Sequence, residues 1–382
     1  MKFLGYITAH LWRHKRRTFL TVSSVAVALF LFCTLRTVMT SFESALRASA
    51  DTRLVVRHAA SLVFPLPLSY RERLAQVEGV RGISYGNWFG GTYQDPKNQF
   101  AQFAVDVPTI LDLFPELELP AEQAAAFQAE RTSCIVGAKL AEKFGWKLGD
   151  VVPIESTIYP GDFRFTVRGI YKGKTADVDE NTLFFHWDYL NEQMPPVRKD
   201  WVGIYWIEIP SGDLAASVSA RIDDLYANSS QPTKTETEKA FQASFIQMMG
   251  NVSLLLTILG SAILFAILLV TINTMMMAAR ERTTEIAVLK TLGYTDGLVL
   301  RLVGAEAILV SLAGGLIGCG AAFLVFQRVD FTAGGMFPNF TVIPETVGLG
   351  LALAIGMGLA SGLVPALQAG RLRIASALRK VA

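Results

Sequence analysis

The sequence is short of charge, cysteine and histidine, and each shortage excludes a class of protein. Charged residues make up 18% of its 382 residues and hydrophobic residues 51%, whereas a soluble domain carries about 25% charged residues. The formal net charge of +2 is too small to indicate a nucleic-acid-binding protein. With three cysteines the chain has no disulfide framework. The composition therefore predicts a membrane protein.

The cysteines and histidines also lack the spacing of a functional site. Cys33 and Cys319 lie in apolar tracts, and Cys134 stands alone in the polar middle of the chain. We interpret all three as small apolar residues and expect no metal or cofactor on this chain. The four histidines form no catalytic pattern; they are His10, His14, His58 and His186. A Ser/His/Asp arrangement stays open, although no nucleophile-elbow signature supports it.

Charge is missing altogether from one tract. No Asp, Glu, Lys or Arg occurs between Lys239 and Arg280. A helix of that length measures about 60 Å, roughly twice the hydrocarbon core of a bilayer. We therefore expect a continuous rod, in which a transmembrane helix is fused to a stalk outside the membrane.

The outer part of this tract, residues 240–252, has its own pattern. Apolar residues at helical spacing give it one apolar face, formed by Phe241, Phe245, Met248 and Val252. A single apolar face suits packing on a partner helix. We expect that partner to be the extension of the first span around residues 38–46.

Four apolar segments are long enough to cross a bilayer. They lie at residues 19–35 (continuing towards 42), 253–279, 307–327 and 346–369. The first is too long for a signal peptide and lacks a cleavage site, so we expect a retained anchor. Basic residues gather before the first span, between the second and third, and after the fourth. The positive-inside rule then places both termini in the cytoplasm.

The expected fold class is an α-helical membrane protein with four transmembrane helices and an extracytoplasmic α+β domain between the first two. In chain order we expect a cytoplasmic amphipathic helix (1–17), span one with a stalk (18–41), the α+β domain (42–239) and a stalk with span two (240–279). A cytoplasmic coupling helix and loop (280–300), span three (301–327), an outer loop (328–345), span four (346–370) and a cytoplasmic tail (371–382) follow.

Strand and helix patterns predict that the α+β domain is ferredoxin-like and split by an insertion at about residues 95–195. Two strand–helix–strand units are expected, at residues 52–57, 69–77 (with Ser69 as N-cap) and 80–85, and at 202–209, 213–226 and 232–237. Inside the insertion we expect a strand, a helix and two further strands, at residues 134–137, 138–144, 151–155 and 163–171. The polar run 228–239 is the expected hinge into span two.

One segment is similar to a phosphate-binding loop. It begins at Gly169 and ends with Gly173, Lys174 and Thr175, but it has three intervening residues where the Walker A motif needs four. It also follows a strand with no evident helix start. We therefore expect no nucleotide site on this chain.

Charge returns directly after span two, in the sequence RERTTEIAVLKTLGYTD from Arg280. Glu281 and Glu285 lie four residues apart and share a helix face. We expect a short amphipathic helix suited to a groove on another protein, with Gly293 as its C-terminal stop. The other candidate contact residues are Arg282, Ile286, Leu289 and Lys290. An ordinary solvated helix is the alternative that these residues leave open.

The pattern R-E-R-x-x-E-I-x-x-x-K-x-x-G after a transmembrane helix resembles the coupling segment of the MacB/FtsX-type ABC permease superfamily, the type VII ABC proteins with a mechanotransmission fold. The C-terminal tail is similar to that family's pattern at Val364-Pro365-Ala366, Ala369, Arg371 and Ala377-Leu378-Arg379, but Leu367 and Gln368 depart from it. The outer domain of the family is similar at Val136-Gly137, Leu140-Ala141, Phe144, Gly149-Asp150, Phe165, Val167 and Gly169-Ile170. The motifs are specific to the superfamily and not to any member.

The resemblance implies a non-catalytic subunit, with ATP and Mg²⁺ bound by a separate ABC ATPase. It implies a second permease copy in contact through spans one and two, a place in the bacterial cytoplasmic membrane, and MacB-like efflux of periplasmic cargo. In a cell with two membranes, a periplasmic adaptor and an outer-membrane channel are further implied partners. An FtsX-like scaffold that activates a cell-wall hydrolase and a lipoprotein-release permease remain as alternatives.

Three further features have structural interpretations. The pairs Gly314/Gly318 and Gly358/Gly362 predict close helix packing within the subunit. Arg36 and Glu306 are expected at the ends of spans rather than in a proton relay. Five aromatic residues of the outer domain are expected in its core rather than on a cargo surface, namely Trp88, Phe89, Trp187, Trp201 and Trp206.

Overall fold

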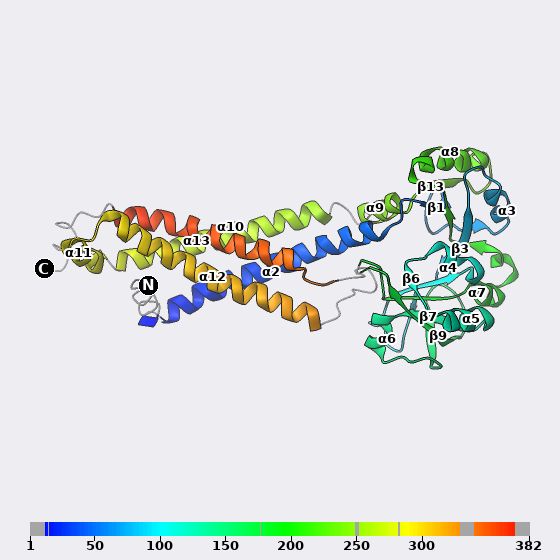
Figure 1. Cartoon of the computed structure of the whole chain (residues 1–382), viewed down its shortest axis with the longest axis horizontal. Helices are drawn as coiled ribbons and strands as arrows, with labels where there is room; N and C mark the ends of the chain where they lie inside the picture. Colours follow the sequence, from blue (N-terminus) through cyan, green and yellow to red (C-terminus); the bar gives the residue numbers. More distant parts are fainter. Residues whose placement is uncertain are drawn as a thin grey trace. The chain divides into compact units, whose positions relative to one another are not determined.

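The computed structural model of the chain describes residues 12–13, 15–175, 177–248, 252–281, 283–328 and 340–370, which fall into two compact units (Figure 1). The helical bundle falls within Met1–Met39, Asn251–Val329 and Thr341–Ala382. The sheet domain falls within Thr40–Gly250 and Asp330–Phe340. Each unit has a hydrophobic core of its own.

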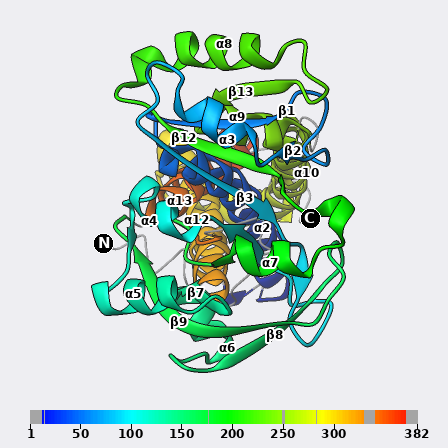
Figure 2. The same cartoon turned by 90° about the vertical axis from the view of Figure 1, so that its right-hand side faces the viewer.

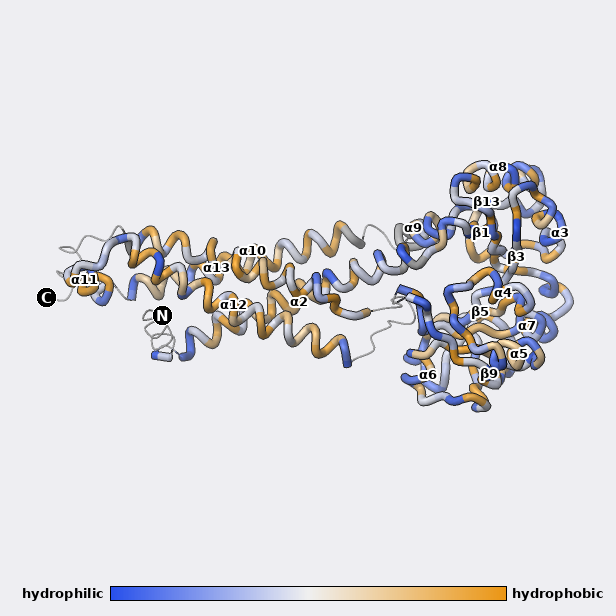
Figure 3. The backbone as a smooth tube through the Cα atoms, in the orientation of Figure 1, coloured by the Kyte–Doolittle hydropathy of each residue, from blue (hydrophilic) through white to orange (hydrophobic). Residues whose placement is uncertain are grey.

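Four long helices confirm the four expected spans. They are α2 (Lys15–Ala48), α10 (Val252–Glu281), α12 (Asp296–Arg328) and α13 (Pro344–Gly370). Each is long and apolar enough to cross a membrane, and hydrophobic residues run along much of α10, α12 and α13 (Figure 3). The third helix begins at Asp296 rather than at 301, because an acidic residue in the first turn favours a helix start.

Glycines allow these helices to approach closely within one chain, as their spacing predicts. A Cβ atom added at Gly318 of α12 would lie 2.2 Å from the carbonyl oxygen of Ala26 in α2. A Cβ atom added at Gly358 of α13 would lie 2.7 Å from the Cα atom of Ile308 in α12. Neither distance leaves room for a methyl group, so glycine is required where α2, α12 and α13 meet.

Glu306 differs from its expected position. It lies several turns inside α12 and is 7% exposed, whereas the sequence placed it at the end of a span. The helix begins earlier than expected, at Asp296, so Glu306 lies within it and is buried in the bundle.

The sheet domain contains the ferredoxin-like core that the sequence predicts. Its elements are β1 (Arg53–His58), α3 (Tyr70–Ala75), β3 (Gly82–Trp88), β12 (Ile204–Glu208), α8 (Ala215–Tyr226) and β13 (Thr233–Thr237). The strands lie in the order β13-β1-β12-β3, and neighbours are antiparallel. Both strand–helix–strand units therefore contribute to one sheet.

Two local details differ from the expected pattern. Ser69 precedes α3 but its side chain makes no capping hydrogen bond. The strand expected at 202–209 is interrupted, because β11 (Trp201–Val202) pairs with β2 (Leu66–Pro67) and β12 starts only at Ile204. The short 3₁₀ turn η2 (Gly212–Leu214) directly precedes α8, and the Ser211 hydroxyl accepts a hydrogen bond there from the backbone N–H of Asp213.

The insertion between β3 and β12 extends the same sheet (Figure 2). Its strands follow β3 in the spatial order β5-β10-β7-β9-β8-β4, and β6 pairs with β9. They are β5 (Ala101–Val105), β10 (Thr182–His186), β7 (Ser133–Gly137), β9 (Phe163–Gly173), β8 (Val151–Ser156), β4 (Gly91–Thr92) and β6 (Leu117–Glu118). The antiparallel pairing of β3 with β5 joins the insertion to the ferredoxin-like core.

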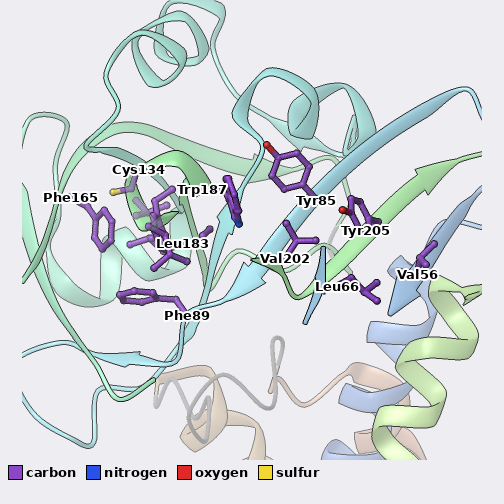
Figure 4. Close-up of a cluster of buried hydrophobic side chains, with 14 of the residues drawn as sticks. Val56, Leu66, Tyr85, Phe89, Cys134, Phe165, Leu183, Trp187, Val202 and Tyr205 are labelled. Carbon is purple, nitrogen blue, oxygen red and sulfur yellow. The ribbon is translucent and has the colours of Figure 1, made fainter. Parts of the chain in front are cut away.

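Helices cover both faces of this sheet. The first face packs against α3, α8, α6 (Ala138–Phe144) and α7 (Trp187–Gln193), and the second against α4 (Val107–Leu113), α5 (Ala121–Ala129) and α9 (Glu238–Met248). Figure 4 shows part of the first core, with Phe89, Phe165 and Leu183 close together. The short 3₁₀ helix η1 (Pro196–Arg198) follows α7.

The uncharged tract contains two helices, α9 and α10, on either side of residues 249–251, which lie outside the described residues. The expected continuous rod therefore stays a prediction at that point. The expected hinge at 228–239 is wrong over its second half. Residues Thr233–Thr237 form β13, paired with β1, and Glu238 begins α9, because alternating threonines there fit a half-buried strand.

Candidate functional site

The charged segment after α10 forms a short helix, α11 (Thr283–Thr291). It ends as expected at Gly293, whose φ is +93°. The backbone N–H of Gly293 donates to the carbonyl of Lys290 at 3.1 Å, and that of Tyr294 donates to the carbonyl of Leu289 at 3.1 Å. This pair of bonds is a Schellman cap, which needs a left-handed residue. Arg282 lies outside the described residues.

Lys290 has a partner within its own chain. Its Nζ lies 2.9 Å from Oδ1 of Asp296, the first residue of α12, and its side chain is only 7% exposed. The pair closes the turn between α11 and α12. Lys290 was predicted to contact another protein, but in the structure it pairs with Asp296 and so links α11 to α12.

The apolar residues of α11 divide into an inner and an outer set. Ile286 is 4% exposed and packs against Val299 of α12. Val288 and Leu292 are 46% and 70% exposed, and they lie four residues apart on one helix face. The sequence predicted Ile286 as a contact residue, whereas the structure buries it. The apolar surface open to another molecule is formed by Val288 and Leu292, with Leu289 half-buried.

The two glutamates of this segment face arginines that precede or begin α2. Glu281 Oε2 lies 2.5 Å from Nη1 of Arg17, and Glu285 Oε1 lies 3.6 Å from Nη1 of Arg13. Arg280 and Glu285 are exposed. Sequence reasoning did not find these ion pairs, because more than 260 residues separate their members. The basic residues before span one and the acidic face of α11 have opposite charges, and this complementarity was the signal from which the ion pairs could have been predicted.

The proposed stalk residues are only partly described. Phe241 of α9 packs against the second core of the sheet domain, which includes Val55 and Trp206. The expected packing of this face on the helix around residues 38–46 stays a prediction. The side chains of Phe245, Met248 and Val252 lie outside the described residues.

One serine and one histidine of the sheet domain lie close together without forming a nucleophile and a base. Ser133 Oγ is 3.5 Å from His186 Nε2. The same Nε2 lies 2.6 Å from the carbonyl oxygen of Phe127, which accepts only, so Nε2 carries the proton. Ser133 also donates to Phe127. His186 therefore cannot take a proton from Ser133, and the pair fastens α5 to β7 and β10.

The segment similar to a phosphate loop is occupied by its own chain. The backbone N–H of Gly173 donates to Glu180 Oε1 at 2.9 Å, and that of Lys174 donates to the carbonyl oxygen of Glu116 at 3.0 Å. Gly173 is still part of strand β9. The segment is therefore a strand end held by a carboxylate and a carbonyl.

Most of the aromatic residues lie in the core, as predicted. Phe89, Trp187 and Trp206 are 0%, 3% and 6% exposed. Trp201 is half-buried. Trp88 differs, with 45% of its surface exposed. It is the last residue of β3, and its ring packs edge-on against Phe103 with the ring centres 5.2 Å apart.

Two family models match this chain. One, described as the MacB-like periplasmic core domain, matches residues 18–225, which is more than half of the chain. The other, described as the FtsX-like permease C-terminal, matches residues 242–374 and so includes α10, α11, α12 and α13.

Several relatives are ABC transporter permeases or contain a permease. The uncharacterized permease MJ1507 of Methanocaldococcus jannaschii is 22% identical over 319 residues, covering 80% of this chain and 77% of that protein. The pyoverdine export ATP-binding/permease protein PvdT of Pseudomonas putida is 29% identical, covering 69% of this chain and 41% of that protein. The macrolide export ATP-binding/permease protein MacB of Sodalis glossinidius is 35% identical, covering 33% and 19%. The chain thus spans less than half the length of both export proteins.

Two solved structures are similar in part to the sheet domain. The periplasmic region of MacB from Actinobacillus actinomycetemcomitans aligns at 9% identity with a TM-score of 0.37, covering 54% of this chain and 96% of that one. The extracellular domain of the ABC-type transporter YknZ from Gram-positive bacteria aligns at 14% identity with a TM-score of 0.35, covering 48% and 98%.

Proposed function

This chain belongs to the MacB/FtsX-type family of ABC transporter permeases, and from that membership we propose that it is the membrane subunit of an ATP-driven export complex. In this proposal a separate ATPase chain binds ATP and Mg²⁺, and this chain binds neither. The permease transmits the movement of the ATPase to the sheet domain, which acts on cargo outside the cytoplasm.

The observation that supports this proposal is the outer surface of α11. A rigid cap at Gly293 and the Lys290–Asp296 pair fix the helix. Its exposed face combines a carboxylate, Glu285, with the apolar pair Val288 and Leu292. An apolar centre with a charged rim suits a protein groove better than water. We propose this face as the docking surface for the ATPase.

Movement then passes along the helices joined to this surface. Closure of the ATPase dimer would push α11, and α10 and α12 would move with it because they begin or end within a few residues of α11. We propose that α10 and α9 carry the displacement to the sheet domain. No pore through the bilayer is needed, because cargo is moved on the outer side.

The partners and the location follow from the same proposal. Both termini and α11 would face the cytoplasm, and the sheet domain would lie outside the cytoplasmic membrane of a bacterium. A second copy of the permease would complete the complex. In the most apolar stretch of α10 only 11% of the residues are buried, against 33–39% in the other three candidate spans. The helix α10 therefore offers apolar surface to a second copy. A periplasmic adaptor and an outer-membrane channel would join in cells with two membranes.

Two alternatives share the fold and differ in the outer partner. An FtsX-like scaffold would activate a cell-wall hydrolase, and a lipoprotein-release permease would pull its cargo from the membrane. The match of the MacB-like periplasmic core domain over residues 18–225 favours the export role.

Co-purification from the native host tests the docking surface. We expect an ATPase to co-purify with the wild-type chain and to be lost with Leu292→Asp, because a charge would replace the centre of the apolar contact. Leu148→Asp is the matched control, since Leu148 is 52% exposed and belongs to the sheet domain; it should keep the ATPase. Equal recovery of ATPase with Leu292→Asp and wild type would contradict the proposal.

A further inference from the structure

Arg53 lies where three segments of the sheet domain meet. It is the first residue of β1, and its side chain is 4% exposed. Its Nε donates to Glu238 Oε2 at 2.9 Å, and its Nη2 donates to Glu116 Oε1. Its Nη1 donates to the carbonyl oxygen of Leu113. The guanidinium carbon also lies 3.7 Å from the centre of the Phe114 ring.

The partners of Arg53 come from different parts of the fold. Glu238 is the first residue of α9, and its Oε2 also accepts a hydrogen bond of 3.0 Å from the backbone of Ala50, between α2 and β1. Glu116 belongs to the insertion, between α4 and β6. One guanidinium therefore joins the entry from α2, the exit into α9 and the insertion.

Burial makes this connection stiff. A planar guanidinium binds carboxylates in a fixed geometry, and a buried ion pair that loses one member leaves an uncompensated charge. Burial raises the pKa of Glu238, and the charge of Arg53 opposes that rise. Moving the α2 or α9 junction away from Arg53 would break its buried pair with Glu238, and moving the insertion away would break its bonds to Glu116 and to the carbonyl of Leu113.

The backbone hydrogen bonds that join the ferredoxin-like core to the insertion involve one short pair of strands. Strands β3 and β5 are paired over Gly86–Trp88 and Phe103–Val105, and one further backbone bond follows at each end, from Phe89 to Gln102 and from Asp106 to Tyr85. The Arg71–Asp106 pair, at 3.1 Å, also joins the two parts, but it lies on α3 and at the start of α4, away from α2 and α9. Arg47, at the end of α2, also reaches the insertion, with its Nη2 3.8 Å from Asp177 Oδ1, but its side chain is 55% exposed. Arg53 is buried and contacts both helix junctions and the insertion.

We propose that Arg53 is the positioning residue through which movement of α2 and α9 reaches the insertion. The proposal rests on the proposed function, in which those helices transmit the movement of an ATPase. Without the bonds from Arg53 to Glu116 and Leu113, β1 and β13 would still move with the helices, but the insertion would follow less closely.

Arg57 provides a matched control on the same strand and the same face. Its Nε lies 2.9 Å from Glu236 Oε1 on β13, and the two side chains are 13% and 10% exposed. This pair lies within the ferredoxin-like core and does not touch the insertion. Glu116→Gln and Glu236→Gln therefore remove the same charge from two similar pairs, and only the first acts on the connection to the insertion.

The test measures a distance between core and insertion in the complete complex. Spin labels are attached at Leu148→Cys in the insertion and Leu225→Cys on α8, which are 52% and 40% exposed. The native Cys33, Cys134 and Cys319 are buried and do not compete for the label. The full chain is studied in nanodiscs with the ATPase that co-purifies from the native host, before and after adding Mg-ATP with orthovanadate.

We expect the nucleotide to shift the label-to-label distance fully in the wild type and in Glu236→Gln, and the shift to be smaller in Glu116→Gln, where Arg53 loses its charged partner in the insertion and keeps the carbonyl of Leu113. A full shift in Glu116→Gln would overturn the role of Arg53. An equal reduction in both variants would overturn it too, since general loosening would then explain the result. If the wild type itself shows no shift while the ATPase is bound, the proposed transmission fails, and the Arg53 proposal fails with it.

Discussion

His186 is a single buried residue whose protonation state affects the stability of the sheet domain. Burial lowers its pKa below the ordinary value of 6.5. The unfolded chain therefore takes up a proton at a higher pH than the folded chain. Stability that is present above the unfolded pKa is lost as the pH falls through 6.5 towards the lowered folded pKa.

We expect the unfolding temperature of the wild type to fall more between about pH 7.5 and about pH 5.5 than that of His186→Gln, which cannot titrate in this range. Tryptophan fluorescence measures this unit, because of the six tryptophans only Trp12 lies outside the sheet domain. The difference between the two proteins isolates His186 from the buried carboxyl groups. Parallel pH profiles for the two proteins would show that His186 is not the group responsible.

At this scale, local signals in the sequence were reliable and long-range ones were absent. Gly293 was predicted as the helix stop because a C-terminal cap depends on neighbouring residues only. Ile286 and Lys290 were assigned to another protein because their partners, Val299 and Asp296, lie on the next helix. Within a helix of nine residues, the spacing of side chains does not show whether an apolar or charged residue faces solvent or packs on the next helix.

At the scale of elements, the contact between α2 and α12 depends on the absence of a single methyl group. We expect Gly318→Ala to destabilise the bundle by about 1–3 kcal/mol, as overpacking does, because the new Cβ would meet the backbone of Ala26. Gly320→Ala, on the same helix, meets nothing within 4 Å. It should be neutral or should gain up to about 1 kcal/mol from helix propensity.

Loss of helical circular dichroism on heating in detergent measures this difference. If Gly318→Ala is as stable as Gly320→Ala, the two helices do not pack as closely as the structure shows. The comparison needs both variants, because a glycine in a helix lowers stability even where it packs against nothing.

The sequence predicted the elements of the ferredoxin-like core and missed the strands that join the insertion to it. Strands β8 and β9 alternate between buried and exposed residues, so their period of two was visible. Strands β5 and β10 are parallel neighbours covered on both faces, and their residues are buried almost without alternation. A short apolar run of this kind gives no period that separates a strand from a buried helix.

At the scale of the whole molecule, the proposed transmission requires stiffness between α9 and α10. We predict that Gly-Pro inserted between Met248 and Val252 leaves assembly with the ATPase intact and uncouples ATP hydrolysis from the change in the sheet domain, because proline interrupts a helix. ATP hydrolysis and the label distance described above are measured on the same sample. Unchanged coupling in the insertion variant would show that a continuous rod is not needed.

The pairing of β1 with β13 has a consequence for how force acts on the sheet domain. The two strands are antiparallel, and Leu54 at the start of β1 is paired with Thr237 at the end of β13. The chain therefore enters and leaves through neighbouring strands at the same end. A pull that separates α2 from α9 would break the hydrogen bonds between β1 and β13 one at a time, as a zipper opens. A push on both helices together would load all of these bonds at once. The clamp of Arg53 on Glu238 lies at the opening end of that zipper, so the domain resists the one direction of load in which a sheet is weakest.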